Sequence, residues 1–215
     1  MDVLELIKSR RSIRTFEKKP VSKEIIRECL ETAIWAPSPT NHQPWNFVVV
    51  AGKELDKIRD IVLQNFPKRM QGMDAFSNLP EPCIKRQEEL FVTLFRVTDE
   101  EGIDQGNMFQ RMLTFFEAPV GVFFVTYRRD DHQYRYSITA ALENFLLAAH
   151  SKGLGTCWLG VAAACEEDIR KHLGISNEME ITGCLALGYP QKDSKFNTFT
   201  RTRVPSDELT TWIGF

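Results

Sequence analysis

The sequence predicts one globular domain, residues 1–215, that contains both helices and strands, and three observations support this. A chain of 215 residues fits a single domain of ordinary to large size and can bury a full core. A composition of 43% hydrophobic and 26% charged residues is typical of a soluble globular protein. Segments with the helical spacing of apolar residues also alternate with short, continuous apolar runs, which are typical of buried strands.

The first half of the chain predicts a series of short elements. Residues 2–9 have the pattern of a short helix, and Ser22 is a good N-cap for a second helix that Pro37 and Pro39 end. Residues 46–51 form a continuous apolar run, so we expect a strand buried on both faces. Residues 53–66 return to helical spacing.

The middle of the chain, approximately residues 67–118, is rich in Met and Phe and has helical spacing over 88–97 and 107–117. Such residues most often form core, and a mobile cover over a ligand is the second interpretation. We expect this stretch to be a variable insertion or lid within the domain. If the protein is an enzyme, its choice of substrate should depend on this region.

The second half of the chain predicts strands at 120–127 and 180–189 and a short helix at 166–173. A longer helix at 136–152 is apolar on nearly all sides, which indicates burial in the centre of the domain or in a subunit interface, and we favour the interface. The apolar chain end must be covered by its own domain or by a partner; its members are Leu209, Trp212, Ile213 and Phe215.

Composition and motifs argue against several function classes. The net charge of -2 gives no general attraction to nucleic acid or to membranes, and no apolar run approaches the roughly 20 residues that span a bilayer. The start of the chain also lacks the layout of a secretion signal. We therefore expect a cytoplasmic protein with no nucleic-acid partner and no membrane contact.

The five cysteines form no Cys-x-x-Cys pair, and their odd number argues against a disulfide framework. The four histidines have no metal-ligand spacing, so we predict no metal site. A nucleophilic pair such as Cys157 with His150 stays open as an alternative, although no local motif supports it.

The segment from Gly153 to Gly160 reads Gly-Leu-Gly-Thr-Cys-Trp-Leu-Gly. Its glycine spacing and its helix-to-strand direction differ from a dinucleotide fingerprint, and Val161 follows where a P-loop needs lysine. We interpret Gly153 and Gly155 as a helix C-cap and turn. Gly160 is predicted to be a point where a flat ligand or another backbone approaches closely.

Two polar segments near the N-terminus are candidates for ligand binding. Arg10-Arg-Ser-Ile-Arg14 would place alternate side chains on one side if its backbone is extended, and three guanidiniums suit a phosphate or an anionic cofactor. A solvated charge run is the alternative. The loop from Ala36 to Trp45 holds its amides and hydroxyls between prolines, which suits a polar ligand; an ordinary helix-to-strand connection is the alternative.

Together, these motifs resemble the nitroreductase family of FMN-dependent oxidoreductases. The resemblance consists of Arg10–Arg14, Pro37-Ser-Pro-Thr-Asn-His-Gln-Pro-Trp45, Gly153–Gly160, Gly188-Tyr-Pro190 and Arg201-Thr-Arg203, in this order and at suitable spacing. Each motif alone is weak evidence, whereas the ordered set is strong. The resemblance covers both ends of the chain and leaves about 67–118 unmatched.

The resemblance implies an α+β fold, with a mixed, mainly antiparallel central sheet wrapped by helices, in an intertwined homodimer. It implies two FMN sites at the subunit interface, with the last residues of each chain embracing the other. The phosphate, ribityl chain and ring edge of FMN would contact Arg10, Arg11, Ser12 and Arg14, and the partner's loop would contribute Pro37, Ser38, Pro39 and Asn41. The flavin ring would lie against Trp158, Leu159 and Gly160. Arg201 and Arg203 would close on the phosphate.

The activity that the resemblance implies is an NADH- or NADPH-dependent oxidoreductase that works by a ping-pong cycle through FMN. The flavin would carry the chemistry, so no catalytic acid or base is assigned. Where some members contact flavin N5 with a Glu-Gly pair, this chain has Gly160, so a backbone N–H would serve.

The oxidant is open among nitroaromatics, quinones, free flavin, enones and halogenated phenols, so a flavin reductase or a reductive dehalogenase fits the same resemblance. A flavin-binding or redox-sensing protein without turnover would use the same FMN residues. A phosphate-binding module would instead use Arg10–Arg14 as a basic patch. All of these stay open on the sequence.

Overall fold

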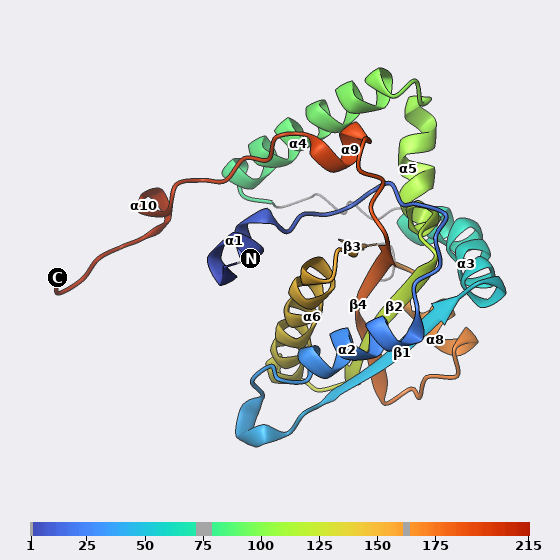
Figure 1. Ribbon diagram of the computed structural model, residues 1–215. Helices are drawn as coiled ribbons and strands as arrows, with labels where there is room; N and C mark the ends of the chain where they lie inside the picture. The colour runs from blue at the N-terminus through green and yellow to red at the C-terminus, as the bar shows by residue number, and fades with distance from the viewer. Residues whose placement is uncertain (1, 72–78, 161–163) are drawn as a thin grey trace.

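The computed structural model describes residues 2–71, 79–160 and 164–215. At its centre lies a four-stranded sheet in which all neighbouring strands are antiparallel, in the order β1-β2-β4-β3 (Figure 1). The strands are β1 (Trp45–Ala51), β2 (Val120–Tyr127), β3 (Gly155–Trp158) and β4 (Met179–Gly188). The predicted α+β fold with a mainly antiparallel sheet is confirmed.

Helices and single turns surround this sheet, and most lie near the predicted positions. They are α1 (Val3–Ser9), α2 (Lys23–Ala33), η1 (Pro39–Asn41), α3 (Lys53–Met70), α4 (Glu81–Glu100), α5 (Gln105–Leu113), η2 (Phe115–Glu117), α6 (Gln133–Ser151), α8 (Glu166–His172), α9 (Lys195–Thr198) and α10 (Ser206–Leu209). The region 67–118 therefore contains the long helix α4 and the shorter α5. Part of it, residues 72–78, lies outside the described residues.

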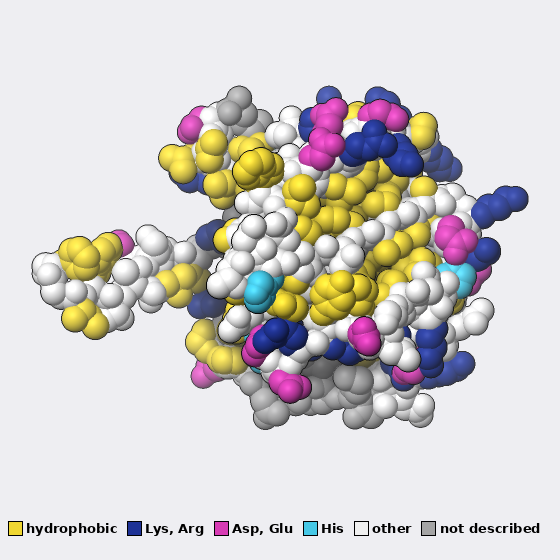
Figure 2. Space-filling view, turned by 90° about the horizontal axis from the view of Figure 1, so that it is seen from below, with side chains coloured by type: hydrophobic (Ala, Val, Ile, Leu, Met, Phe, Trp, Pro, Cys, Tyr) yellow, Lys and Arg dark blue, Asp and Glu magenta, His cyan; other side chains and the backbone are white. Residues whose placement is uncertain are grey.

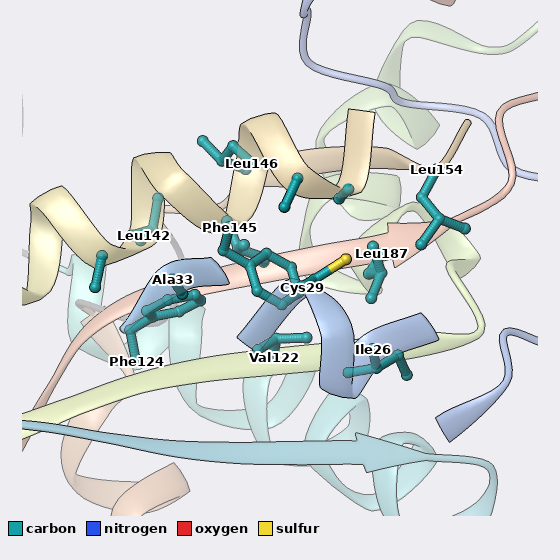
Figure 3. Close-up of a cluster of buried hydrophobic side chains, with 14 of the residues drawn as sticks. Ile26, Cys29, Ala33, Val122, Phe124, Leu142, Phe145, Leu146, Leu154 and Leu187 are labelled. Carbon is teal, nitrogen blue, oxygen red and sulfur yellow. The ribbon is translucent and has the colours of Figure 1, made fainter. Parts of the chain in front are cut away.

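One face of the sheet is covered by α2 and α6. Figure 3 shows their side chains meeting those of β2 and β4, with Phe145 of α6 edge-on to Phe124 of β2 at a centroid distance of 5.6 Å. The buried residues of α6 are Ser137, Ile138, Ala141, Leu142, Phe145, Leu146, Ala148 and Ala149. Much of its apolar surface is thus buried within the chain, which agrees with the domain-centre alternative. A subunit interface on α6 stays a prediction.

The opposite face of the sheet carries α3, α5 and α8. Their apolar side chains form a second core with the outer side of β2 and β4, including Ile58 of α3, Phe123 of β2 and Ile169 of α8, all fully buried. The protein therefore has three layers, in which helices cover both faces of one sheet (Figure 1).

Local signals at the helix ends hold as predicted, with one correction. The Ser22 hydroxyl accepts a hydrogen bond from the N–H of Ile25 at 3.4 Å, so Ser22 is the N-cap of α2. Gly153 has a φ of 75° and donates its N–H to the carbonyl of His150 at 3.0 Å, which is a helix C-cap. Gly155 is not part of a turn, because it is already the first residue of β3.

The predicted burial of β1 on both faces is wrong for the isolated chain. Val50 is buried, but Val49 is 38% exposed and the other residues of the strand are at most half-buried or exposed. The reason is position: β1 is an edge strand, paired with β2 on one side. A continuous apolar run does not distinguish such a strand from a central one.

The basic segment near the N-terminus lies beside β3 with an extended backbone. The N–H of Ile13 bonds to the carbonyl of Thr156 at 2.8 Å, and Ser12 pairs with Thr156 as a parallel bridge. Further along, the N–H of Glu17 bonds to the carbonyl of Tyr189 at 2.9 Å. An added Cβ at Gly155 would lie 2.7 Å from Cγ1 of Ile13, so a side chain there would collide with the docked segment.

The C-terminal segment leaves the body of the protein after α9. Figures 1 and 2 show it extending away from the core, with apolar side chains along it. Trp212 is 67% exposed and Phe215 fully exposed, and Leu209 and Ile213 are exposed as well. The expected cover from the chain's own domain is therefore not found within the described residues. No described helix is long and apolar enough to cross a membrane.

We predict that Gly155→Ala destabilises the fold by about 1–3 kcal/mol, because Ile13 is β-branched and its backbone is held by β3. Urea unfolding followed by circular dichroism measures this free energy. Gly160→Ala is the matched control, since an added Cβ there meets no described atom within 4 Å. Equal free energies of unfolding for the two variants would contradict this, because they would show that the segment around Ile13 shifts to accept the added methyl group without loss of stability.

Candidate functional site

A cavity of about 860 Å³ lies between the basic segment, the first turns of α4 and the segment after α9. Its walls carry six arginines and one lysine against two glutamates. The lining residues are Arg10, Arg11, Ser12, Arg14, Pro82, Lys85, Arg86, Glu89, Leu90, Thr93, Phe199, Thr200, Arg201, Thr202, Arg203, Val204, Glu208 and Leu209. The excess of positive charge makes this cavity suitable for an anion.

Backbone carbonyls hold the guanidiniums in place. Arg11 donates from Nη2 to the carbonyl of Phe199 at 2.7 Å, and its guanidinium lies 4.9 Å from the centre of the Phe199 ring. Arg201 donates to the carbonyl of Lys8 at 2.9 Å and to that of Arg10, which ties the C-terminal segment to the basic segment. Since carbonyls are neutral, these bonds fix the arginines without neutralising their charge.

Two buried donors in this cluster are unsatisfied. The Nε atoms of Arg10 and Arg11 have no hydrogen-bond partner among the described residues, although Nε of Arg10 lies 3.4 Å from a carboxylate oxygen of Glu143. Buried N–H groups of charged side chains are costly without a partner. An anionic ligand in the cavity would supply acceptors for such groups.

The crowding of cations changes the titration of the cluster. Burial, followed by the charges of Arg201 and Arg14, lowers the pKa of Arg11. Burial, followed by Arg203 and Arg10, lowers the pKa of Arg201 in the same way. Burial disfavours any charge, but the contribution of the neighbouring arginines reflects a local positive potential, which favours a negative charge.

A second cavity, of about 200 Å³, adjoins the first and shares Arg14 with it. It is lined mostly by apolar and aromatic side chains of α4, α5 and the end of β3: Arg14, Leu90, Phe91, Leu94, Met108, Phe109, Arg111, Met112, Phe116, Cys157, Trp158, Leu159 and Phe196. Such a cavity suits a flat apolar or aromatic group. Trp158 and Leu159, which were expected beside a flat ligand, are on its wall.

The structure thus brings together most of the predicted site residues in a single chain. Arg10, Arg11, Ser12, Arg14, Arg201 and Arg203 line the first cavity, and Trp158 and Leu159 line the second. Arg11, which the resemblance placed with its neighbours in the basic segment, lines the same cavity, although strict alternation along an extended backbone would turn it to the other side. In this segment, Ile13 is the residue that packs inward against Gly155.

The remaining predicted residues line neither cavity: Pro37, Ser38, Pro39, Asn41 and Gly160. The loop is nevertheless ordered by its own contacts, because the Ser38 hydroxyl accepts a hydrogen bond from the N–H of Gln43 at 3.0 Å. Thr40, Asn41 and Gln43 all have positive φ, between 42° and 58°, which is strained for residues other than glycine. No described atom lies within 4 Å of an added Cβ at Gly160, whereas the Ile13 side chain closely approaches Gly155. The approach of a flat ligand to Gly160 stays a prediction.

Sequence reasoning missed Lys85, Arg86, Arg111 and Phe199 on the cavity walls, and it missed Asn197, which bonds to the backbone of Arg14. The first three lie in the unmatched middle of the chain. Asn197 and Phe199 lie in the short stretch before Arg201, and an aromatic residue so close to a predicted arginine pair was the available signal, since guanidiniums stack on rings.

The cysteines give no support for a nucleophile. Burial raises the pKa of the Cys157 thiol, and His150 shares a hydrogen bond with the hydroxyl of Ser9 at 2.9 Å. Burial also raises the pKa of Cys29 to about 11 and that of Cys184 well above its usual value. Cys83 on α4 is exposed. The described residues contain no cluster of three metal-binding side chains.

We predict that one thiol of the five, that of Cys83, reacts rapidly with an aromatic disulfide reagent in the native protein at pH 8, because thiolates react and burial suppresses them. Thiol titration should give one equivalent in buffer and five in guanidinium chloride. Cys83→Ser should remove the native reaction. A fast second equivalent that survives in this variant would show that a buried cysteine is activated.

Comparison with known proteins agrees with this geometry. The chain is 27% identical to the chloronitrobenzene nitroreductase of Comamonas testosteroni, over 97% of this chain and 96% of that one. It is 28% identical to the 4-nitrobenzoate reductase of Pseudomonas putida, over 98% and 95%. The crystal structure of the FMN and NADPH-dependent nitroreductase NfnB from Sphigopyxis sp. strain HMH superposes with a TM-score of 0.88 at 26% identity, covering all of both chains.

A family model covers most of the chain as well. The description of that model is "Nitroreductase family", and it matches residues 7–189, a range that holds the basic segment, the loop after α2, the complete sheet and α4 to α6. The cationic cavity and its apolar neighbour are built largely from this range. The chain therefore belongs to the nitroreductase family.

Proposed function

We propose that this protein is an FMN-dependent NAD(P)H oxidoreductase that reduces nitroaromatic compounds or related small electrophiles. The observation that carries the proposal is the pair of adjoining cavities: one is lined by six arginines and suits a phosphate, and the other is aromatic and suits a flat ring. FMN contains both groups. Relatives described as nitroreductases and an FMN-dependent structural neighbour support this assignment.

The residues present fit the phosphate of FMN. Arg10 and Arg11 each have a buried Nε without a partner among the described residues, and Arg203 bonds to the neighbouring carbonyl of Thr202 at 2.7 Å. Each charge-assisted bond from such a group to a phosphate contributes about 1.5–3 kcal/mol. We assign Arg10, Arg11 and Arg203 to the phosphate. Arg201 is engaged with the backbone and holds the cluster together.

Arg14 is assigned to the ring, because it is the residue of the basic segment that lines both cavities. When bound, FMN accepts a hydride from NAD(P)H and passes electrons to the oxidant. The protein's part is to hold a positive charge near the ring edge where negative charge develops, and Arg14 supplies it. Trp158 and Leu159 form the apolar wall beside it.

Selection of the oxidant is assigned to α4 and α5, in the region 67–118. Phe91, Phe109 and Met112 from these helices line the second cavity together with Trp158 and Leu159. Aromatic and Met side chains favour flat apolar molecules and adapt to their shape. The interpretation of this region as core holds only in part, because Phe109 is 46% exposed, whereas Leu94, Val97 and Met108 of the same helices are buried.

A homodimer completes the proposed site. The loop with Pro37, Ser38, Pro39 and Asn41 lines neither of the two cavities described above, so its proposed place is beside the FMN of the partner subunit. The exposed apolar tail with Trp212 and Phe215 would be covered by that partner as well.

The test of the proposal combines binding, turnover and mass. The purified protein should bind one FMN per chain, oxidise NADH or NADPH when a nitroarene or menadione is added, and sediment as a dimer. FMN binding without turnover over a broad panel of oxidants would favour a flavin-binding sensor. A protein that takes up no FMN on reconstitution would refute the proposal, and a monomer that retains FMN would refute the shared site.

We predict that Arg203→Ala raises the dissociation constant of FMN by on the order of 10- to 100-fold, which corresponds to one lost charge-assisted bond. At saturating FMN, turnover should change much less. Flavin fluorescence titration and steady-state kinetics measure the two effects. Arg27→Ala is the control, because Arg27 is exposed on α2 and lines neither cavity. Arg201→Ala should in addition lower the melting temperature, since Arg201 joins two segments of the fold.

A further inference from the structure

Asn197 is a buried polar residue with an unusual set of partners. It lies in α9, is 6% exposed, and belongs to no motif that points to a ligand. Its Oδ1 accepts hydrogen bonds from the backbone N–H groups of Arg14 at 2.8 Å and Thr15 at 3.3 Å. Its Nδ2 donates to the carbonyls of Thr15 at 2.7 Å and Gln191 at 2.9 Å. All four bonds that an amide side chain can form are therefore made.

A second, half-buried side chain holds the same segment from α5. Arg111 donates from Nη2 to the carbonyl of Arg14 at 3.0 Å and to the hydroxyl of Thr15 at 3.2 Å. Its guanidinium stacks on Phe196, the neighbour of Asn197, at 4.9 Å from the ring centre. Both backbone polar groups of Arg14 are thus bonded, the N–H to Asn197 and the carbonyl to Arg111.

The side chain of Arg14 is held far less firmly than its backbone. Its guanidinium donates to the carbonyl of Ser12 at 3.5 Å, the outer limit of a hydrogen bond, and lies 5.9 Å from the centre of the Phe199 ring. No ion pair to it is found among the described residues. The position of this charge therefore depends mainly on where the backbone of residue 14 is fixed.

We propose that Asn197 is a positioning residue that fixes Arg14 at the junction of the two cavities. The inference rests on the proposed function, in which Arg14 lies at the edge of the FMN ring. Asn197 lines neither cavity and would not touch the flavin. It acts through the backbone of Arg14, and Arg111 assists from the other side.

The consequence for the flavin follows from electrostatics. A cation at the ring edge favours the reduced, negatively charged state over the oxidised, neutral state, so it raises the reduction potential of bound FMN. If Arg14 moves away, this stabilisation decreases and the potential falls. FMN affinity also decreases, because the cation contacts the ligand.

The test replaces Asn197 by Leu, which has a similar volume and forms none of the four hydrogen bonds. Asn197→Leu should raise the dissociation constant of FMN about fivefold or more and lower the midpoint potential of the bound flavin. Arg170→Met is the matched control: it also removes hydrogen bonds of a buried polar side chain, from Arg170 to the carbonyl of Ile175 at 3.3 Å and to Oδ1 of Asn177, at a residue that lines neither cavity. The control should lose thermal stability and keep the wild-type potential.

A double-mutant cycle with Arg14→Ala separates positioning from general destabilisation. If Asn197 acts through Arg14, then Asn197→Leu should change the affinity less than about twofold and the potential negligibly once Arg14 is Ala. Full additivity of the two substitutions would overturn the inference. So would an Asn197→Leu protein with wild-type affinity and potential.

Failure of the proposed function is recognised separately, because the wild-type protein would then bind no FMN at all. Should Asn197→Leu fail to fold, Asn197→Ser gives the same comparison with a smaller disturbance, since its hydroxyl can retain part of the bonding. A Ser variant that folds and keeps the wild-type potential and affinity would likewise count against the inference.

Discussion

The candidate site depends on the docking of residues 12–17 beside β3. The hydrogen bond from Ile13 to Thr156 and the contact between Ile13 and Gly155 fix this extended segment on the edge of the sheet. Because Ile13 is turned inward, the residues on either side of it are left on the cavity wall, and Arg14 reaches the junction of the two cavities. The same docking covers the edge of β3, which would otherwise expose unpaired backbone groups.

Holding these arginines together has an electrostatic cost that the fold offsets with neutral partners. The lowered pKa values of Arg11 and Arg201 show the cost, since burial and neighbouring cations both disfavour the charged state. The carbonyls of Phe199, Lys8 and Arg10 offset part of it by hydrogen bonding. Because they carry no net charge, the positive potential remains for a ligand. Carboxylates in the same places would have stabilised the free protein and weakened its attraction for a dianion.

Sequence patterns predicted the parts of this structure that depend on local periodicity and capping. The apolar spacing of α2 with its Ser22 cap, the continuous run of β2 and the acidic start of α8 are of this kind. The basic segment and the Arg201–Arg203 pair were also recognisable, because charge and order along the chain identify them. Asn197 could not be recognised from the sequence, because its hydrogen bonds join segments up to 183 residues apart along the chain. The incomplete burial of β1 depends on its place in the sheet order, which residue type does not encode.

The strained loop at residues 40–43 and the exposed apolar C-terminal tail have no evident role within a single chain, and the proposed homodimer gives a role to both. Residues 40, 41 and 43 keep strained backbone conformations, at a cost of roughly 1–3 kcal/mol each, in a loop that lines neither of the two cavities. A hydrogen bond from the N–H of Gln43 to the Ser38 hydroxyl and another between Tyr134 and His42 maintain that shape within one chain. The apolar tail is likewise uncovered. If a second copy uses both, FMN binding and dimerisation are thermodynamically linked, so each must strengthen the other by the same factor.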